Sequence, residues 1–256
     1  MDAAYWMREY ERLLNSGKIR EEDCDQAVLD YHIPLLERLD AIDGSSIALF
    51  DFRTRSYRFL TQSFKFLAGY DRDDAIEGGP EFFFRIMRRD HLPFVLETVT
   101  RSFAFLGGAP PAERKDYRLS FDFAIEPPGR KAVRLVPQVV VLELDRRANI
   151  WLVLIANDLA PPGAIGADPS RRLLNTRTGA CPLFSGDGKD FPETDLSRRE
   201  LEVLALVASG LASRDIADRL FISVSTVNNH RQRILEKLDS KSSAEAVRYA
   251  MSLGLI

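Results

Sequence analysis

The C-terminal residues 196–256 place the strongest constraint on what this chain can fold into. Apolar side chains recur there at helical spacing in four short segments, and residues that begin or end helices stand between the segments. Ser197 and Glu200 form the pattern of a capping box, and Gly210 stands where a left-handed residue would end a helix. A second Ser-x-x-Glu pattern, starting at Ser242, precedes the last segment. The spacing predicts an all-α domain of four helices.

The third of these segments, residues 223–238, differs between its two faces. Val227, Ile234 and Leu238 form an apolar stripe, whereas the opposite face carries basic and amide side chains. A short helix and a turn precede this segment. The order fits a helix-turn-helix, in which the second helix of the pair enters the major groove of DNA.

The residues of this region resemble the LuxR-type (GerE-like) helix-turn-helix over nearly its whole length. The matching motifs are Leu-Ser-x-Arg-Glu-x-Glu-Val-Leu from residue 196, Ile-Ala-x-Arg-Leu from 216, Ser-Val-x-Thr-Val-x-x-His from 223, and Lys-Leu at 237. Ala212 departs from the family, which usually has Ser or a similar cap there. Its loss should cost about 1 kcal/mol of helix stability unless Ser213 substitutes. The resemblance implies a bacterial transcription regulator that binds double-stranded DNA as a homodimer, and it leaves contact with RNA polymerase open.

The same resemblance indicates which side chains contact DNA. Bases are read by the residues after the Thr-Val pair, here Asn228 and Asn229, with Gln232 one turn further on. Side-chain amides match N6 and N7 of adenine, which indicates half-sites that contain A·T pairs. The alternative is that the two asparagines are solvated residues of an outer face. Phosphate contacts are expected from hydroxyl, imidazole and cationic side chains: Arg214, Ser225, Thr226, His230, Arg231, Arg233 and Lys237. For Arg233 and Lys237 the alternative is an internal ion pair, for instance with Glu200 or Glu202.

Residues 44–160 change to a pattern of short strands around a helical middle. Two strand signals precede residue 61 and three follow residue 116, which predicts an α+β domain with a five-stranded antiparallel sheet. This part resembles a PAS domain at four short segments: 51–54, 66–70, 89–93 and 154–159. It departs from the family at the corner before the long helix, where it reads Arg-Arg-Asp-His. PAS domains of this kind bind small molecules or cofactors, or simply dimerise.

Which of these roles applies here is only partly constrained by the residues. Cys24 and Cys181 lie outside the domain, which excludes flavin chemistry that needs a cysteine over the ring. His91 is the domain's one histidine, and a corner histidine is expected to be hydrogen-bonded rather than a haem ligand. Eight phenylalanines between residues 64 and 105 predict an aromatic core, with an apolar ligand cavity as the alternative. We expect no catalytic site, no metal and no resident cofactor, and a ligand of unknown identity stays open.

The remaining segments connect or flank these domains. Residues 1–43 show helical periodicity that fits either a flank packed on its own domain or a dimerisation helix. Residues 161–195 are a linker by composition, with a short hairpin expected at 173–181 around a left-handed Gly179. On the fourth C-terminal helix, a group of apolar side chains is a candidate dimer contact: Val247, Tyr249, Ala250 and Leu253. The alternative is burial within the domain, which fits Val247 and Ala250 better than Tyr249 or Leu253.

Charge distribution and hydropathy bear on the partner and the cellular location of the protein. Residues 196–256 hold nine Lys and Arg against seven Asp and Glu, whereas the whole chain holds 35 against 38. A mildly basic small domain on a more acidic body suits a DNA reader joined to a regulatory part. No apolar run reaches the length of a membrane span, and the N-terminus lacks the pattern of a secretory signal. These features favour a cytoplasmic protein.

Overall fold

Alternating apolar residues form one antiparallel sheet in the computed structural model, which describes residues 2–16, 19–41, 46–160, 168–184, 196–238, 240–252 and 256. The strand order is β2-β1-β6-β5-β3-β7, and β4 pairs with β5 beyond the end of β3. The strands are β1 (Ser46–Asp51), β2 (Ser56–Leu60), β3 (Tyr117–Phe121), β4 (Phe123–Ile125), β5 (Val133–Leu144), β6 (Ile150–Leu159) and β7 (Arg171–Asn175). The predicted α+β class is confirmed, with two more strands than the pattern indicates.

The first additional strand arises from a break at Asp122. The sequence predicts one strand over 117–125, but the structure divides it into β3 and β4. Pro137 of β5 lies beside the break and cannot donate a ladder hydrogen bond, so little pairing is lost there. The side chain of Asp122 turns instead to Arg134 and Ser170.

The second additional strand lies in the expected linker. Gly179 has a left-handed φ of 73°, as predicted. The residues before it form β7, which pairs with β3 of the sheet and does not belong to an isolated hairpin. The guanidinium of Arg171 lies 5.0 Å from the ring centre of Phe94 and 4.2 Å from that of Phe184. Stacking on Phe94 holds residues 171–184 to the larger domain, and stacking on Phe184 joins the two ends of this segment itself.

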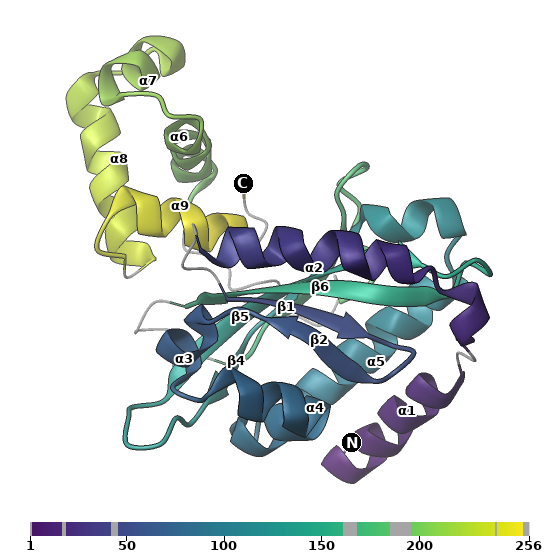
Figure 1. The fold of residues 1–256 in the computed structure, drawn as a ribbon. Coiled ribbons are helices and arrows are strands. Elements are labelled where there is room, and N and C mark those ends of the chain that lie inside the picture. The colour runs from purple at the N-terminus through teal and green to yellow at the C-terminus, as the bar shows by residue number, and fades with distance from the viewer. Residues whose placement is uncertain are drawn as a thin grey trace.

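Helices cover both faces of the sheet (Figure 1). They are α1 (Ala3–Ser16), α2 (Gln26–Asp40), α3 (Ser63–Ala68), α4 (Arg72–Ile86), α5 (Leu92–Gly108), α6 (Arg198–Ala208), α7 (Ser213–Leu220), α8 (Val224–Lys237) and α9 (Ser243–Ser252), with short 3-10 turns at Glu21–Asp23 and Pro111–Asp116. We call the face under α1, α4 and α5 the inner face, and the face under α2 the outer face. The four predicted C-terminal helices are confirmed as α6 to α9.

The N-terminal flank packs on its own domain. Leu29 and Leu36 of α2 are buried on the outer face together with Trp151 of β6. On the inner face α1 lies along α5. This is the packed-flank alternative of the sequence analysis, and a role of these helices in dimerisation stays a prediction.

The C-terminal helices dock on the outer face of the sheet through α9. Val136 of β5 is completely buried in the same cluster as Tyr249 of α9, which is 9% exposed. Beside them the Arg248 Nε lies 3.9 Å from an Asp158 carboxylate oxygen. Burial, followed by the charge of Asp122, raises the pKa of the Tyr249 phenol to about 12. Tyr249, an expected dimer contact, therefore packs within the chain here, and Leu253 lies outside the described residues.

Across the described helices, none combines the length and the hydropathy that a membrane crossing requires.

A buried ion pair lies close to this docking contact. Arg134 Nη2 is 2.5 Å from Asp122 Oδ1, and the two side chains are 2% and 4% exposed. Ser170 Oγ donates to the other carboxylate oxygen at 2.7 Å, and Arg134 also donates to the carbonyl of Asp168 at 2.7 Å. The group joins the break between β3 and β4 to β5 and to the segment before β7.

Asp122→Ala should lower the free energy of unfolding by about 3–5 kcal/mol, because it removes one partner of a buried, hydrogen-bonded ion pair. Glu22→Ala is the control, since Glu22 pairs with Arg20 at the surface and such pairs contribute at most about 1 kcal/mol. Urea denaturation of both variants measures the difference. Equal small losses would contradict the importance of the buried pair.

Candidate nucleic-acid interface

The ends of the C-terminal helices are fixed by the residues that the sequence singles out. Ser197 Oγ accepts from the Glu200 amide at 3.3 Å, and Glu200 Oε2 accepts from the Ser197 amide at 2.6 Å, which completes the capping box of α6. Gly210 has a φ of 82° after α6. At α7 the capping residue is Ala212, and no side chain caps the helix. These observations confirm the predicted helix boundaries and the missing cap.

The helix α8 is held by its apolar stripe. Val227 and Ile234 are buried against Ile216 and Ala217 of α7 and against Val203 of α6. Its N-terminus is capped by a serine, whose hydroxyl accepts from the amide three residues later at 3.0 Å. With one face fixed in this way, the rotation of α8 decides which side chains reach the surface.

The three amide side chains predicted to read bases are all exposed. Asn228, Asn229 and Gln232 lie on the part of α8 opposite the apolar stripe. Gln232 Nε2 donates to Glu236 Oε1 at 3.0 Å, so a base contact by this amide would have to replace or share that bond. The structure therefore brings the predicted residues together on one outer surface.

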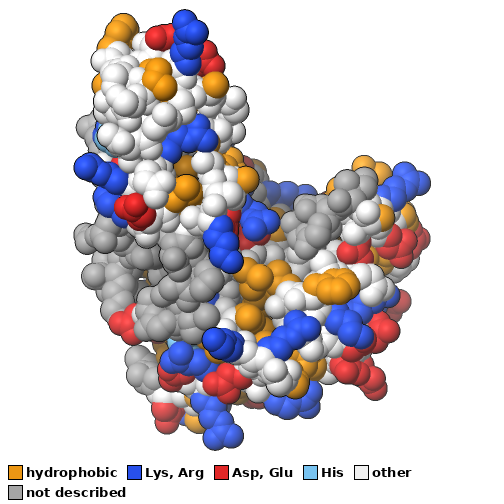
Figure 2. Space-filling view, turned by 90° about the vertical axis from the view of Figure 1, so that its left-hand side faces the viewer, with side chains coloured by type: hydrophobic (Ala, Val, Ile, Leu, Met, Phe, Trp, Pro, Cys, Tyr) orange, Lys and Arg blue, Asp and Glu red, His pale blue; other side chains and the backbone are white. Residues whose placement is uncertain are grey.

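The predicted phosphate-contacting residues fall into two groups. Arg214, Ser225 and Arg233 are exposed, and Thr226 is half-buried beside Ser225 at the start of α8. The hydroxyls of Ser225 and Thr226 each lie 2.7 Å from the hydroxyl of the capping Ser223. Ser225 and Thr226 lie in the first turn of α8, Arg214 lies in the first turn of α7, and Arg233 lies in the C-terminal half of α8. Figure 2 shows Lys and Arg side chains spread over this projecting part of the molecule.

Of the three remaining predicted residues, Arg231 and Lys237 bond to other side chains of the domain. Arg231 donates to the hydroxyl of Ser213 at 3.1 Å and to that of Ser243 at 3.0 Å, which links α7, α8 and α9. Lys237 Nζ lies 2.8 Å from Glu200 Oε2, the internal ion pair named as its alternative. His230 is half-buried, and its Nδ1 has no hydrogen-bond partner among the described residues.

Two apolar residues at the start of α8 were not singled out by the sequence. Phe221 is 95% exposed and Val224 is 42% exposed. One signal could have identified Phe221. It is an apolar residue directly after α7, at the position where the chain adopts a left-handed conformation and glycine is preferred.

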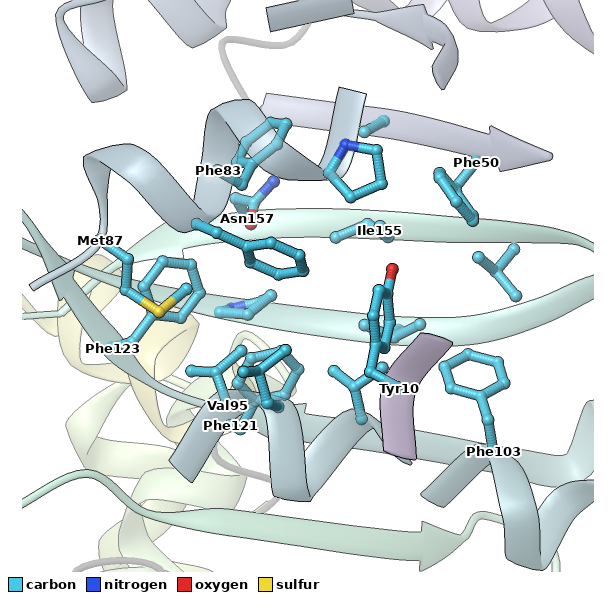
Figure 3. A pocket seen from close by; sticks show the side chains of 18 of the residues that line it. Tyr10, Phe50, Phe83, Met87, Val95, Phe103, Phe121, Phe123, Ile155 and Asn157 are labelled. Carbon is cyan, nitrogen blue, oxygen red and sulfur yellow. The ribbon is translucent and has the colours of Figure 1, made fainter. Parts of the chain in front are cut away.

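The inner face of the sheet encloses a cavity of about 120 Å³ (Figure 3). Its walls are almost wholly apolar, and no charged side chain is among the described residues that line it. Tyr10 reaches into it from α1, and Tyr57 and Asn157 supply its other polar groups. Burial raises the pKa of both phenols, so they stay neutral hydroxyl donors. Phe83 and Phe103 line this cavity, whereas Phe66, also expected in the core, is 82% exposed.

His91 lies at the corner before α5 and is not among the residues that line this cavity. It is 3% exposed, and its Nδ1 accepts from the amide of Ala124 at 3.0 Å. Desolvation, with the nearby Arg88, lowers the pKa of the imidazole and keeps it neutral. The expected hydrogen-bonded role of this histidine is confirmed.

The cavity and the C-terminal helices share two strands. Pro137 of β5 pairs with Asn157 of β6, and both line the cavity. The adjacent pair, Val136 and Asp158, lies on the outer face, where Val136 packs with α9 and Asp158 approaches Arg248. Successive strand residues thus contact the cavity on one side and the helical domain on the other.

Comparison with known proteins assigns the C-terminal part of the chain. Residues 194–250 match the GerE family, described as bacterial regulatory proteins of the luxR family. The oxygen regulatory protein NreC of Staphylococcus haemolyticus is 51% identical over 61 residues, which are 24% of this chain and 28% of that protein. NreC of Staphylococcus epidermidis is 49% identical over the same share. The chain therefore spans less than a third of these relatives' length, and the LuxR-type resemblance is confirmed for this region.

Solved structures resemble the chain more distantly. One of them is a Vibrio cholerae VqmA dimer, described among LuxR-type receptors. The match covers 88% of this chain and 88% of the VqmA chain, with 16% identity and a TM-score of 0.36. The N-terminal domain of a diguanylate cyclase with a PAS/PAC sensor from Marinobacter aquaeolei covers 45% of this chain and 94% of its own, with 10% identity and a TM-score of 0.37. At these scores the likenesses carry no weight for the function of this chain.

Arg231→Ala should lower the free energy of unfolding by about 1–3 kcal/mol, because it removes the charged donor of two hydrogen bonds that join three helices. Arg233→Ala should change it by less than about 0.5 kcal/mol, because Arg233 is exposed. Denaturation of the two variants, which differ by two positions on one helix, gives the comparison. Similar values for both would contradict the internal role of Arg231.

Proposed function

We propose that this protein is a transcription regulator that binds specific DNA sequences through residues 196–256 under the control of a PAS-like input domain, residues 44–160. Residues 1–43 form a flank of the input domain, and residues 161–195 connect the two domains. The role needs no catalytic chemistry. It places the protein in the bacterial cytoplasm, where its DNA target lies.

The observation that carries this proposal is the orientation of α8. Its apolar stripe is buried against α6 and α7, so Asn228, Asn229 and Gln232 are held outward together. An exposed row of amides on the second helix of a helix-turn-helix is suited to adenine in the major groove. The luxR family match over residues 194–250 supports the same role.

Phosphate contacts are assigned to the residues that border this row. Arg214, Ser225, Thr226 and Arg233 are the direct candidates, because their polar groups lie at or near the surface. His230, Arg231 and Lys237 are also among the phosphate-contacting residues predicted from the sequence. A phosphate contact by Arg231 would compete with its hydrogen bonds to Ser213 and Ser243. One by Lys237 would compete with its bond to Glu200. Arg231 is therefore better suited to positioning α8.

We further propose that the protein acts as a homodimer. One small domain buries too little surface for tight specific binding, and two copies can occupy inverted half-sites one helical turn apart. The contact that joins the copies is not assigned to particular residues. Contact with RNA polymerase, and whether transcription rises or falls, also stay open.

The cavity supports sensing as the role of the input domain. Its apolar walls and three neutral polar groups suit a small uncharged molecule, because a buried charge there would have no counter-charge. The alternative, a domain that only mediates protein interaction, is better suited to an aromatic core without an internal space.

The two strands between the cavity and α9 offer a route for control. A ligand beside Pro137 and Asn157 would press on strands whose opposite face holds Val136 and Asp158 against the helical domain. A small change in this contact would alter the position of α8 relative to a second copy. Coupling of this kind requires only that the ligand bind the two arrangements with different affinity.

Duplexes selected from a random library by the full-length protein test the DNA-binding role. Asn228→Ala should lose discrimination at one base pair, at a cost of about 1–3 kcal/mol on the selected site. Arg233→Ala should weaken all sequences alike and reduce the slope of log affinity against log salt by about 1. Fluorescence anisotropy at several salt concentrations measures both effects.

Two results would contradict this assignment. An unchanged base preference in Asn228→Ala would show that this amide does not read bases. Failure of the wild-type protein to enrich any sequence would contradict the DNA-binding role itself.

Thermal unfolding of the full-length protein against a library of small metabolites tests the sensing role. An uncharged binder at a hundred times its Kd should stabilise the protein by about 2.7 kcal/mol, whereas charged compounds should not. Val139→Phe, which fills the cavity, should abolish the shift. Val140→Phe is the matched control, since the adjacent residue of β5 lies on the outer face.

The same compound should change the affinity of the wild-type protein for its selected DNA and leave that of Val139→Phe unchanged. A shift that survives Val139→Phe would place the ligand elsewhere. If no compound of the library shifted the thermal midpoint, the alternative role would be favoured, in which residues 44–160 only mediate protein interaction.

A further inference from the structure

Two helices of the C-terminal domain end in the same backbone motif with very different residues. The left-handed position is Gly210 after α6, at φ 82°, and Phe221 after α7, at φ 55°. In both cases the amide of this residue donates to the carbonyl three residues earlier, and the next amide donates to the carbonyl five residues earlier. This pair of bonds is the common helix ending that favours glycine at the left-handed position.

Phenylalanine at this position has two costs that its own domain does not offset. A side chain with a Cβ is strained in the left-handed region. The ring is also 95% exposed, so burial within the described chain does not compensate the strain. A strained residue of this kind is retained where its side chain serves a function.

The position of Phe221 points to the surface that carries the amide row. It precedes the capping Ser223 of α8 by two residues. Val224, which is 42% exposed, starts the helix, and Asn228 and Gln232 follow it at intervals of four. Residues at this spacing share one face of a helix. An apolar pair therefore lies at the N-terminal end of the amide row.

The amide row beside this apolar pair favours a nucleic acid over a protein as the occupant. At the end of α7 the exposed charges are balanced, with Asp218 and Arg219 next to each other. The major groove presents one apolar group at base edges, the C5 methyl of thymine, and this group accompanies adenine in every A·T pair. Amides for adenine and an apolar pair for thymine would read the same kind of base pair from one helix.

We propose that Phe221 and Val224 form a thymine-reading site that contacts C5 methyl groups next to the base pairs read by Asn228. This inference rests on the proposed DNA-binding function. It adds Phe221 as a residue that determines sequence specificity, and it explains why glycine is absent at the end of α7.

Replacement of single thymines by uracil in the selected duplex tests the site, because uracil lacks only the methyl group. At one or two positions the wild-type protein should lose about fourfold in affinity, the equivalent of one buried methyl group. Phe221→Gly should lose about tenfold on the thymine duplex and be insensitive to uracil at those positions. The variant is expected to fold, because glycine is preferred at this backbone position, and its thermal midpoint checks this.

Phe66→Ala is the matched control, since it removes an exposed phenylalanine of the larger domain. It should keep both the affinity and the uracil sensitivity of the wild type. Equal uracil sensitivity in the wild type and in Phe221→Gly would overturn the proposal. So would normal DNA affinity of Phe221→Gly with reduced transcription by purified RNA polymerase, which would assign the ring to a protein contact. A wild-type protein that binds no selected duplex would overturn the proposed function as well.

Discussion

The register of β5 against β6 is the constraint on which the rest of the arrangement depends. The pair of Pro137 and Asn157 lines the cavity, and the adjacent pair of Val136 and Asp158 faces α9. Because successive side chains of a strand point to opposite faces, a slip of one residue turns every side chain of the slipped strand to the other face. A slip of β6 would place the carboxylate of Asp158 in the cavity, and a slip of β5 would remove Val136 from α9. One register therefore specifies both an apolar cavity and a docked helical domain.

The outer face of the sheet is shared between α2 and α9, and this sharing limits what α9 can do. Tyr249 is buried against the sheet in the docked arrangement, so the same surface cannot contact a second copy at the same time. Docking and self-association through this surface exclude each other. A ligand that weakens docking would favour association, and one that strengthens it would oppose association, each by its difference in affinity for the two states.

Sequence reasoning predicts what depends on local signals. The capping box at Ser197, the left-handed Gly210 and the apolar stripe through Val227 define the four C-terminal helices, because caps and periodicity act within a few residues. The partners of Arg231 and Asp122 could not be predicted in this way. Arg231 bonds to residues of two other helices, and Asp122 bonds to Arg134 across a strand break. Contacts of this kind depend on how elements pack, which a single sequence does not encode locally.

Some cations of the C-terminal domain are bonded inside the domain, and this limits how many of them can contact DNA phosphates. The Glu200 carboxylate caps α6 and is 3% exposed at its side chain, so the ammonium of Lys237 balances a buried charge and is costly to redirect. Arg231 is likewise bonded inside the domain, which leaves Arg214 and Arg233 as exposed cations of the predicted set. The sequence-independent attraction to DNA scales with the number of phosphates that cations neutralise. With two cations of the predicted set exposed, base-edge contacts and a second half-site would supply much of the affinity for a specific site, and this supports the proposed homodimer.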